Sequence, residues 1–240
     1  MSNRFSTRSL IQMTHWRIAS CGALAAAAAL FYILFLGNPP VPERCDHFRP
    51  VDQPLIAHAG GGMPNAIYTN SMAAMEIAAA HGFHMIELDL WRTNKGIAVG
   101  HNPQHLSSMT FDQLLDFLRR NPNISIVTDF KSNNVLGLQR VAELAGPMRS
   151  RFIPQIYSLD ELGPVTAMGF PPPIFTAYRM LGLDWLPRVN SAQVRAVTMP
   201  YRHRLLARFI DHPVFLNTVN EPIPGYGLYT DCLIPARHRS

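Results

Sequence analysis

The sequence contains no long run of lysine and arginine, although its formal net charge is +5. Its basic residues lie in small clusters such as RHRLLAR and ARHRS, and aromatic residues do not alternate with them. A surface that binds nucleic acid usually presents a dense basic patch of that kind. We therefore expect no nucleic acid among the partners of this protein.

Cysteine is also scarce, because the 240 residues include only three. They form no cluster with histidine of the kind that binds zinc. Cys21 lies in an apolar segment, whereas Cys45 and Cys232 flank the rest of the chain. In an exported protein these two would be able to pair and tie the ends of the domain together, and the alternative is two unpaired thiols.

Acidic residues are absent before Glu43, and the segment Ile18–Leu36 carries no charge. A helix of this length is about long enough to cross the ~30 Å hydrocarbon layer of a membrane. Because Arg4, Arg8 and Arg17 precede the segment, the positive-inside rule predicts a cytoplasmic N-terminus and export of the rest. A cleaved signal peptide is the alternative, but no small-x-small cleavage site follows and the apolar run is long for such a peptide.

These features divide the chain into successive parts. We expect a basic cytoplasmic tail over residues 1–17, a single-pass membrane anchor over 18–36 and a Pro-rich linker over 37–53. A domain over 54–235 would then lie in the periplasm or outside the cell. A short basic tail over 236–240 ends the sequence.

The 54–235 domain alternates short, apolar, β-rich runs with helical or turn-rich segments. The expected strands are Leu55–Gly60, Met85–Thr93, Ile124–Lys131, Phe152–Ser158, Pro173–Arg179, Val194–Pro200, Pro213–Asn220 and Gly227–Asp231. The clearest helical patterns between them are Ser71–Gly82, Thr110–Pro122, Asn134–Gly146 and Arg202–His212. The second of these begins with Thr110 and Gln113 at the spacing of a capping box. Alternating strands and helices indicate parallel β-α units.

Eight such units predict an α/β fold, a short (β/α)8 TIM barrel. The domain is shorter than the ~250 residues typical of this fold, and the connection Glu221–Tyr226 is too short for a helix. An open doubly wound sheet is the runner-up. A further strand, Gly96–His101, follows the turn TNK and would form a β-hairpin that protrudes from the barrel rim.

Polar residues recur near the C-terminal ends of the first expected strands, where TIM barrels carry their chemistry. In chain order they are His58, Glu87, Asp89, His101, Asp129 and Lys131. Glu87 and Asp89 are two positions apart on one strand, so they point to the same side. Ile86, Leu88 and Leu90 point to the other side. Two acids in an otherwise apolar strand are costly to bury unless a cation lies between them.

Several segments together resemble the glycerophosphodiester phosphodiesterases, which are relatives of the phosphatidylinositol-specific phospholipases C. The segments are IAHAGG, YTNSMAAMEIAAAHGFHMIELDLWRTNKGIAVGHN, VTDFK, FLNTVN and GLYTD. The resemblance covers nearly all of residues 54–235, and the HAGG…YTNS pattern is similar to a divergent bacterial branch. It implies a TIM barrel. It also implies catalytic residues His58 and His101, metal ligands Glu87, Asp89 and Asp129, and a lysine, Lys131, that faces the phosphate.

The sequence departs from the family pattern at four of these motif positions. Ala59 stands in place of an arginine that follows the first histidine, and Thr69 replaces a glutamate. Asn102 follows the second histidine in place of an aspartate, and Asp129 is one methylene shorter than the usual glutamate. Arg179, at the end of an expected strand, is a candidate to supply the missing cation and to bind substrate.

Three carboxylates without a Cys/His cluster favour Ca²⁺ or Mg²⁺ over Zn²⁺. The cation would polarise a phosphoryl oxygen. One histidine would remove a proton from the attacking hydroxyl, and the other would protonate the leaving alkoxide. By family analogy, the attacking hydroxyl belongs to the substrate itself. The function predicted is a membrane-anchored, metal-dependent hydrolase of glycerophosphodiesters or other lipid-derived phosphodiesters.

Other roles remain open for several of these residues. Glu87 and Asp89 would alternatively pair with Lys131 and Arg92, and Lys131 would alternatively neutralise an acid. Asp231 is expected to shape the barrel mouth and not to take part in chemistry. The alternative function is a catalytically silent barrel that binds a phosphorylated lipid head group or a glycan.

Overall fold

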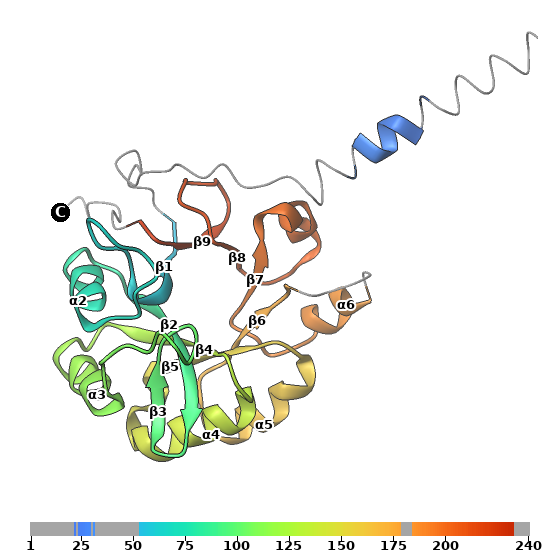
Figure 1. Cartoon of the computed structure of the whole chain (residues 1–240). Helices are drawn as coiled ribbons and strands as arrows, with labels where there is room; N and C mark the ends of the chain where they lie inside the picture. The colour runs from blue at the N-terminus through green and yellow to red at the C-terminus, as the bar shows by residue number, and fades with distance from the viewer. Residues whose placement is uncertain (1–21, 23, 30, 32–52, 179–183, 233–240) are drawn as a thin grey trace, which may run out of the picture. The chain divides into compact units, whose positions relative to one another are not determined.

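The structure is a computed structural model that describes residues 22, 24–29, 31, 53–178 and 184–232. The chain divides into two compact units, Met1–Asn38 and Pro39–Ser240, and each is described here by itself. The second unit holds the sheet and all the numbered helices (Figure 1).

Eight parallel strands form a closed barrel in the second unit (Figure 1). They are β1 (Leu55–Ala57), β2 (Met85–Thr93), β4 (Ser125–Phe130), β5 (Phe152–Ile156), β6 (Ile174–Thr176), β7 (Ala196–Pro200), β8 (Val214–Asn217) and β9 (Gly227–Thr230). The barrel closes because β1 pairs in parallel with both β2 and β9. All eight predicted strands are present, and this closure confirms the TIM barrel over the open doubly wound sheet.

Helices cover the outside of the barrel. They are α2 (Met72–Ala80), α3 (Phe111–Arg120), α4 (Asn134–Ala145), α5 (Leu162–Ala167) and α6 (Trp185–Asn190), with short 3-10 turns η2 (His58–Gly60), η3 (Gly146–Arg151) and η4 (Leu159–Glu161). The capping box predicted at Thr110 and Gln113 begins α3. The main apolar core lies between strands and helices and includes Ile86, Leu88 and Leu90, as their predicted outward direction requires.

A second, smaller apolar cluster is separate from the main core. It is formed by strand residues whose side chains point to the other face of the sheet. It consists of Ile56, Val127, Ile153, Ile174, Ala196, Phe215 and Tyr229. These residues alternate along their strands with those that contact the helices, so they fill the barrel interior. They form an apolar floor beneath the polar residues at the C-terminal ends of the strands.

The last two connections of the barrel lack an α-helix. The segment expected to be helical over Arg202–His212 is instead a 3-10 helix, η5 (Tyr201–Phe209). A 3-10 helix rises ~2.0 Å per residue against 1.5 Å for an α-helix, so it spans the barrel wall with fewer residues. Between β8 and β9 no helix occurs, as the short connection predicts. These two short connections contribute to the small size of the domain relative to a typical TIM barrel.

The predicted hairpin is also present. Strand β3 (Gly96–Val99) pairs in antiparallel fashion with Leu90–Thr93, the C-terminal part of β2. The N-terminal part of β2 pairs with β1 and β4 inside the barrel. One long strand therefore serves both the barrel and the hairpin that projects from its rim.

The predicted membrane anchor over 18–36 and the linker over 37–53 lie largely outside the described residues. Of the anchor, residues 22, 24–29 and 31 are helical and exposed. Among the residues that the structure describes, no helix is both long and apolar enough to span a membrane. Cys232 is buried and disulfide-bonded. Its predicted partner, Cys45, and the tail over 236–240 fall outside the described part of the chain.

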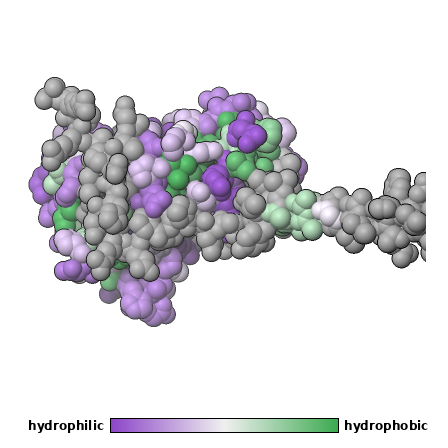
Figure 2. Space-filling view, turned by 90° about the horizontal axis from the view of Figure 1, so that it is seen from above, coloured by the Kyte–Doolittle hydropathy of each residue, from purple (hydrophilic) through white to green (hydrophobic). Residues whose placement is uncertain are grey.

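The surface of the domain is mixed. Hydrophilic and hydrophobic side chains are interspersed on the face shown in Figure 2. The large apolar side chains that are exposed among the described residues of this domain are Ile67, Leu106, Leu136, Leu144 and Phe209, and two of them, Leu136 and Leu144, lie on α4.

Candidate active site

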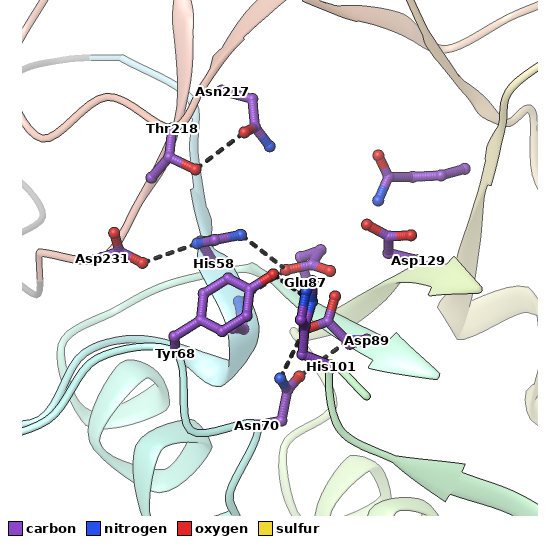
Figure 3. A network of polar contacts seen from close by, with 12 residues as sticks. His58, Tyr68, Asn70, Glu87, Asp89, His101, Asp129, Asn217, Thr218 and Asp231 are labelled. Carbon is purple, nitrogen blue, oxygen red and sulfur yellow. Dashed lines mark hydrogen bonds and ion pairs between the residues drawn. The ribbon is translucent and has the colours of Figure 1, made fainter. Parts of the chain in front are cut away.

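Three carboxylates converge at the C-terminal rim of the barrel, at the centre of the polar network in Figure 3. Glu87 and Asp89 lie on β2, and Asp129 on β4 is the direct register partner of Asp89. One carboxylate oxygen from each residue lies within 4.8 Å of the others. The convergence predicted from the alternation of the strands is therefore observed.

Glu87, like Asp89, is almost fully buried: the exposed fractions are 1% for Glu87 and 0% for Asp89. Its Oε2 accepts a hydrogen bond of 2.7 Å from the backbone N–H of Ala59. Its Oε1 is buried and has no hydrogen-bond partner among the described residues. Burial, followed by the negative charge of Asp89, raises the pKa of Glu87 to about 8.

Asp89 is held by Asn70 and Lys131. The Asn70 side chain donates to Asp89 Oδ2 at 2.7 Å and accepts from the Asp89 backbone N–H at 2.9 Å. Lys131 Nζ lies 2.7 Å from Asp89 Oδ1 and 2.7 Å from Asp129 Oδ2. Lys131 therefore pairs with two of the acids, as one alternative from the sequence had it, whereas Arg92 is an exposed residue. Burial alone would lower the pKa of Lys131, but the charges of Asp129 and Asp89 outweigh it and raise that pKa.

Two tyrosines complete this side of the rim, and sequence reasoning did not single out either for a role. Tyr157 donates a hydrogen bond to Asp129 Oδ1, so both oxygens of Asp129 have partners. Burial raises the pKa values of Tyr157 and Tyr178, and the nearby charge of Asp129 adds to the effect. The sequence did contain one indication of this. Tyr157 lies two residues after Gln155, so the two side chains point to the same side, toward the barrel interior.

His58 stands at the end of β1, and its side chain is 12% exposed. Its Nδ1 lies 2.8 Å from Asp231 Oδ1, and its Nε2 lies 4.0 Å from Glu87 Oε2. Burial lowers the pKa of His58, but the hydrogen bond to Asp231 and the charge of Glu87 raise it further, with a net increase. Asp231 was expected only to shape the barrel mouth. The β1–β9 pairing also brings its carboxylate onto His58, a contact that the sequence did not predict.

His101 follows β3 at the edge of the same rim, and its side chain is 49% exposed. Its Nδ1 lies 2.6 Å from the hydroxyl of Tyr68 and 3.5 Å from Asp89 Oδ2. Tyr68 comes from the loop between β1 and α2, and it too was missed in the sequence. The structure thus brings the predicted residues His58, Glu87, Asp89, His101 and Asp129 to one rim (Figure 3). The predicted Lys131 joins them through its ion pairs with Asp89 and Asp129.

The departures from the family pattern have visible consequences. The Ala59 side chain is fully buried and carries no charge. Thr69 bonds the hydroxyl of Ser71 at 2.9 Å, and Ser71 caps α2. Asn102 accepts hydrogen bonds from Gln104 and His105 and shapes its own loop. Arg179, the predicted substitute cation, lies outside the described residues.

The carboxylate group fits a hard divalent cation. Its donors are all oxygens, the preferred ligands of Ca²⁺ and Mg²⁺. The buried Oε1 of Glu87, which has no hydrogen-bond partner in the described structure, is an unsatisfied acceptor of the kind that a cation would satisfy. Lys131 supplies one positive charge for the three acids.

No protein-family model and no curated protein matches the sequence. Solved structures match the fold. A candidate glycerophosphoryl diester phosphodiesterase from Silicibacter pomeroyi has a TM-score of 0.58 and 14% identity, over 77% of this chain and 92% of that chain. A glycerophosphodiester phosphodiesterase from Thermotoga maritima has a TM-score of 0.55 and 16% identity, over 76% of this chain and 96% of that chain.

A third match is a phosphodiesterase from Oleispira antarctica, solved in complex with the product sn-glycerol-3-phosphate. Its TM-score is 0.57 at 10% identity, over 75% of this chain and 93% of that chain. At identities this low, the similarity shows the fold alone. The chain therefore has the TIM-barrel fold found in structures of glycerophosphodiester phosphodiesterases.

Proposed function

We propose that this protein is a divalent-metal-dependent phosphodiesterase that hydrolyses glycerophosphodiesters or related lipid-derived phosphodiesters. One observation carries the proposal: two histidines from separate β-segments stand beside three converging carboxylates at the C-terminal rim of the barrel. The rim is where TIM barrels place their chemistry. The structural matches, which include a phosphodiesterase in complex with sn-glycerol-3-phosphate, support the substrate class.

Glu87, Asp89 and Asp129 would hold the cation, which is Ca²⁺ or Mg²⁺ in this proposal. When bound, such an ion supplies Lewis-acid polarisation of a phosphoryl oxygen. Lys131 would contribute positive charge on the phosphate side. Arg179 stays a predicted substrate-binding residue.

The hydrogen bonds of the two histidines support different roles for them. If His58 donates its Nδ1–H to Asp231, its Nε2 keeps a lone pair and is suited to accept a proton. His58 would remove the proton from the attacking hydroxyl, which belongs either to water or to a neighbouring position of the substrate. As the new P–O bond forms, the bond to the leaving oxygen breaks. His101 would give its Nε2 proton to that oxygen.

A second candidate function is a silent barrel that binds a phosphorylated head group or a glycan. It is favoured by the position of Lys131, whose Nζ lies between Asp89 and Asp129 and already neutralises charge there. Tyr157 occupies the other oxygen of Asp129. A protein that has replaced its metal by a lysine would keep this arrangement permanently.

Calorimetric titration with Mg²⁺ and Ca²⁺, followed by turnover on a panel of phosphodiesters with each metal, separates the two functions. The phosphodiesterase should bind a cation and release glycerol 3-phosphate or a related monoester only when that cation is present. Glu87→Gln should weaken binding, because it removes one carboxylate ligand with almost no change in the size of the side chain. Absence of both binding and turnover would leave the silent barrel as the function.

We also propose that the domain works outside the cytoplasm and is anchored by the segment 18–36. Two features support this: the uncharged sequence of that segment after three arginines, and the disulfide of Cys232. Disulfides are typical of exported proteins.

A further inference from the structure

Tyr68 lies in the β1–α2 loop and has an unusual backbone conformation. Its φ is 63°, in the left-handed region that bulky residues rarely adopt. Ala59 and Asn70, which flank the same loop, have φ values of 49° and 51°. Backbone strain of this kind persists only where the surrounding structure imposes it.

The loop is fixed at both of its ends. Asn70 donates its backbone N–H to the Ala59 oxygen at 2.8 Å, which closes the loop at its base. The Asn70 side chain is bound to Asp89 in both directions. Met63 and Ala66 exchange backbone hydrogen bonds of 2.7 and 3.3 Å within the loop. The backbone that carries Tyr68 is therefore anchored directly to the acid cluster.

The Tyr68 ring fills the space between the two histidines (Figure 3). Its centroid lies 4.8 Å from that of His58 and 4.9 Å from that of His101, with interplanar angles of 60° and 70°. These are edge-to-face contacts of normal distance. The hydroxyl lies 2.6 Å from His101 Nδ1. Burial, with a further contribution from Asp89, raises the pKa of Tyr68, so its phenol stays protonated.

His101 needs such a partner more than His58 does. It is half-exposed and follows Gly100, whose φ of 142° permits a conformation that other residues rarely adopt. Its other polar neighbour, Asp89 Oδ2, is 3.5 Å away, which is longer than a normal hydrogen bond. His58, in contrast, is largely buried and held by Asp231.

We propose that Tyr68 is the positioning residue of His101. Its hydroxyl engages Nδ1, and its ring sets the spacing of His101 from His58, so Nε2 is the nitrogen presented to the substrate. In the protonated imidazole that acts as the acid, Nδ1–H donates to the phenol oxygen of Tyr68, and Nε2–H gives its proton to the leaving oxygen, which returns His101 to the neutral form. The catalytic part of this inference rests on the proposed phosphodiesterase function, whereas the contact itself does not.

The test compares Tyr68→Phe, which keeps the ring, with Tyr68→Ala, which removes it. Tyr226→Phe is the matched control, because it deletes a half-buried tyrosine hydroxyl that donates at 2.9 Å to the Arg204 oxygen, away from the site. The readouts are the ¹⁵N resonance of His101 Nδ1 at fixed pH in the metal-free protein, and kcat and KM with metal. The resonance reports a hydrogen bond to the ring nitrogen without any need for turnover.

Tyr68→Phe should move the His101 Nδ1 resonance toward that of an unbonded nitrogen and lower kcat about tenfold, with KM nearly unchanged. Tyr68→Ala should cost more, because the packing of both imidazoles is lost as well. Tyr226→Phe should change neither quantity. An unmoved resonance in Tyr68→Phe, or a rise in KM alone, would overturn the proposal. If the wild type shows no turnover, the phosphodiesterase function fails, and the resonance still decides whether Tyr68 holds His101.

Discussion

Glu87 combines three properties at the residue scale that are rarely found together. It is buried, it lies next to other acids, and one of its oxygens has no hydrogen-bond partner in the described structure. Each property alone disfavours the carboxylate form, and together they raise its pKa to about 8. The metal-free site therefore stores a proton, and a cation must displace it in order to bind.

This proton predicts the pH dependence of metal affinity. In the unfolded chain the Glu87 carboxyl has its ordinary pKa of 4.5, whereas in the folded, metal-free protein its pKa is raised to about 8, so it keeps the proton up to that pH. The contribution of Glu87 to folding stability therefore decreases as pH rises between these values. Mg²⁺ or Ca²⁺ should reverse this loss, and its affinity should increase by up to about tenfold per pH unit below pH 8.

Calorimetric titrations at pH 6.5, 7.5 and 8.5 measure that affinity. In Glu87→Gln the amide cannot titrate, so the residual binding should depend much less on pH. A wild-type affinity that is constant over this range would show that Glu87 is already ionised in the metal-free protein.

The two histidines give the clearest kinetic prediction. His58→Ala and His101→Ala should each lower kcat by about 10²–10⁴-fold, the usual contribution of general acid–base catalysis, while the barrel stays folded. His81→Ala is the control, because His81 is an exposed residue whose Nδ1 contacts a backbone oxygen at the end of α2. Steady-state kinetics and circular dichroism provide the measurement. Full metal-dependent turnover in both variants would rule out the two-histidine mechanism.

At the scale of elements, the inward set of residues on β2 and β4 was predictable from alternation alone. Side chains two positions apart share a face, so Glu87 and Asp89 had to point together, and parallel register placed Asp129 beside them. The helix starts were predictable for a similar reason, since a capping box such as that of Thr110 and Gln113 is a local pattern.

The partners of the histidines were not predictable in the same way. Tyr68 lies in a loop and His101 follows a hairpin, and their side chains meet only in the folded structure. Asp231 contacts His58 although the two residues lie at opposite ends of the domain sequence. Contacts of this kind depend on how far a loop folds back, which no local periodicity encodes. The helical pattern before Ile210 failed for another reason. Its apolar residues are half-buried or, in the case of Phe209, exposed, so tertiary packing did not enforce an α-helix.

Gly62 offers a test of how tightly the elements around His58 are packed. A Cβ atom at this position would overlap the backbone oxygen of Asp231, at the end of β9. Gly62→Ala should therefore destabilise the fold by about 1–3 kcal/mol and displace the carboxylate that holds His58. Urea unfolding gives the free energy, and the Nδ1 resonance of His58 reports the hydrogen bond.

A glycine with free space is the appropriate comparison. Gly163 in α5 has nothing within 4 Å of where its Cβ would lie, so Gly163→Ala should be neutral or up to about 1 kcal/mol stabilising. Equal free energies of unfolding for Gly62→Ala and Gly163→Ala would contradict the close packing inferred at the end of β9.

At the scale of the whole molecule, the site depends on closure of the barrel. His58 belongs to the first strand and Asp231 directly follows the last, and they meet because β1 and β9 are paired. Cys232, the next residue, is buried and disulfide-bonded. A covalent link beside the closing strand would limit separation of these two elements, and such a link persists in an oxidising compartment.

The last prediction concerns that compartment. With Arg4, Arg8 and Arg17 before the uncharged segment 18–36, we expect the domain to be exported and to stay attached to the membrane. A reporter that is active only outside the cytoplasm, fused after Ser240, should be active and should resist alkaline extraction from membranes. Release of the active fusion in soluble form would instead indicate a cleaved signal peptide.

The matched control places two arginines in the middle of the segment, as Ala26→Arg with Ala27→Arg. Each arginine at the centre of a membrane helix costs roughly 2.5–3.5 kcal/mol, so insertion should fail and reporter activity should be lost. The Cys232 disulfide should then be absent as well, because the domain would remain in the reducing cytoplasm, and thiol labelling of the denatured protein would detect the change. Activity of a cytoplasm-specific reporter on the unmodified chain would place the domain in the cytoplasm. It would then contradict both the predicted export and a role of the disulfide in barrel closure.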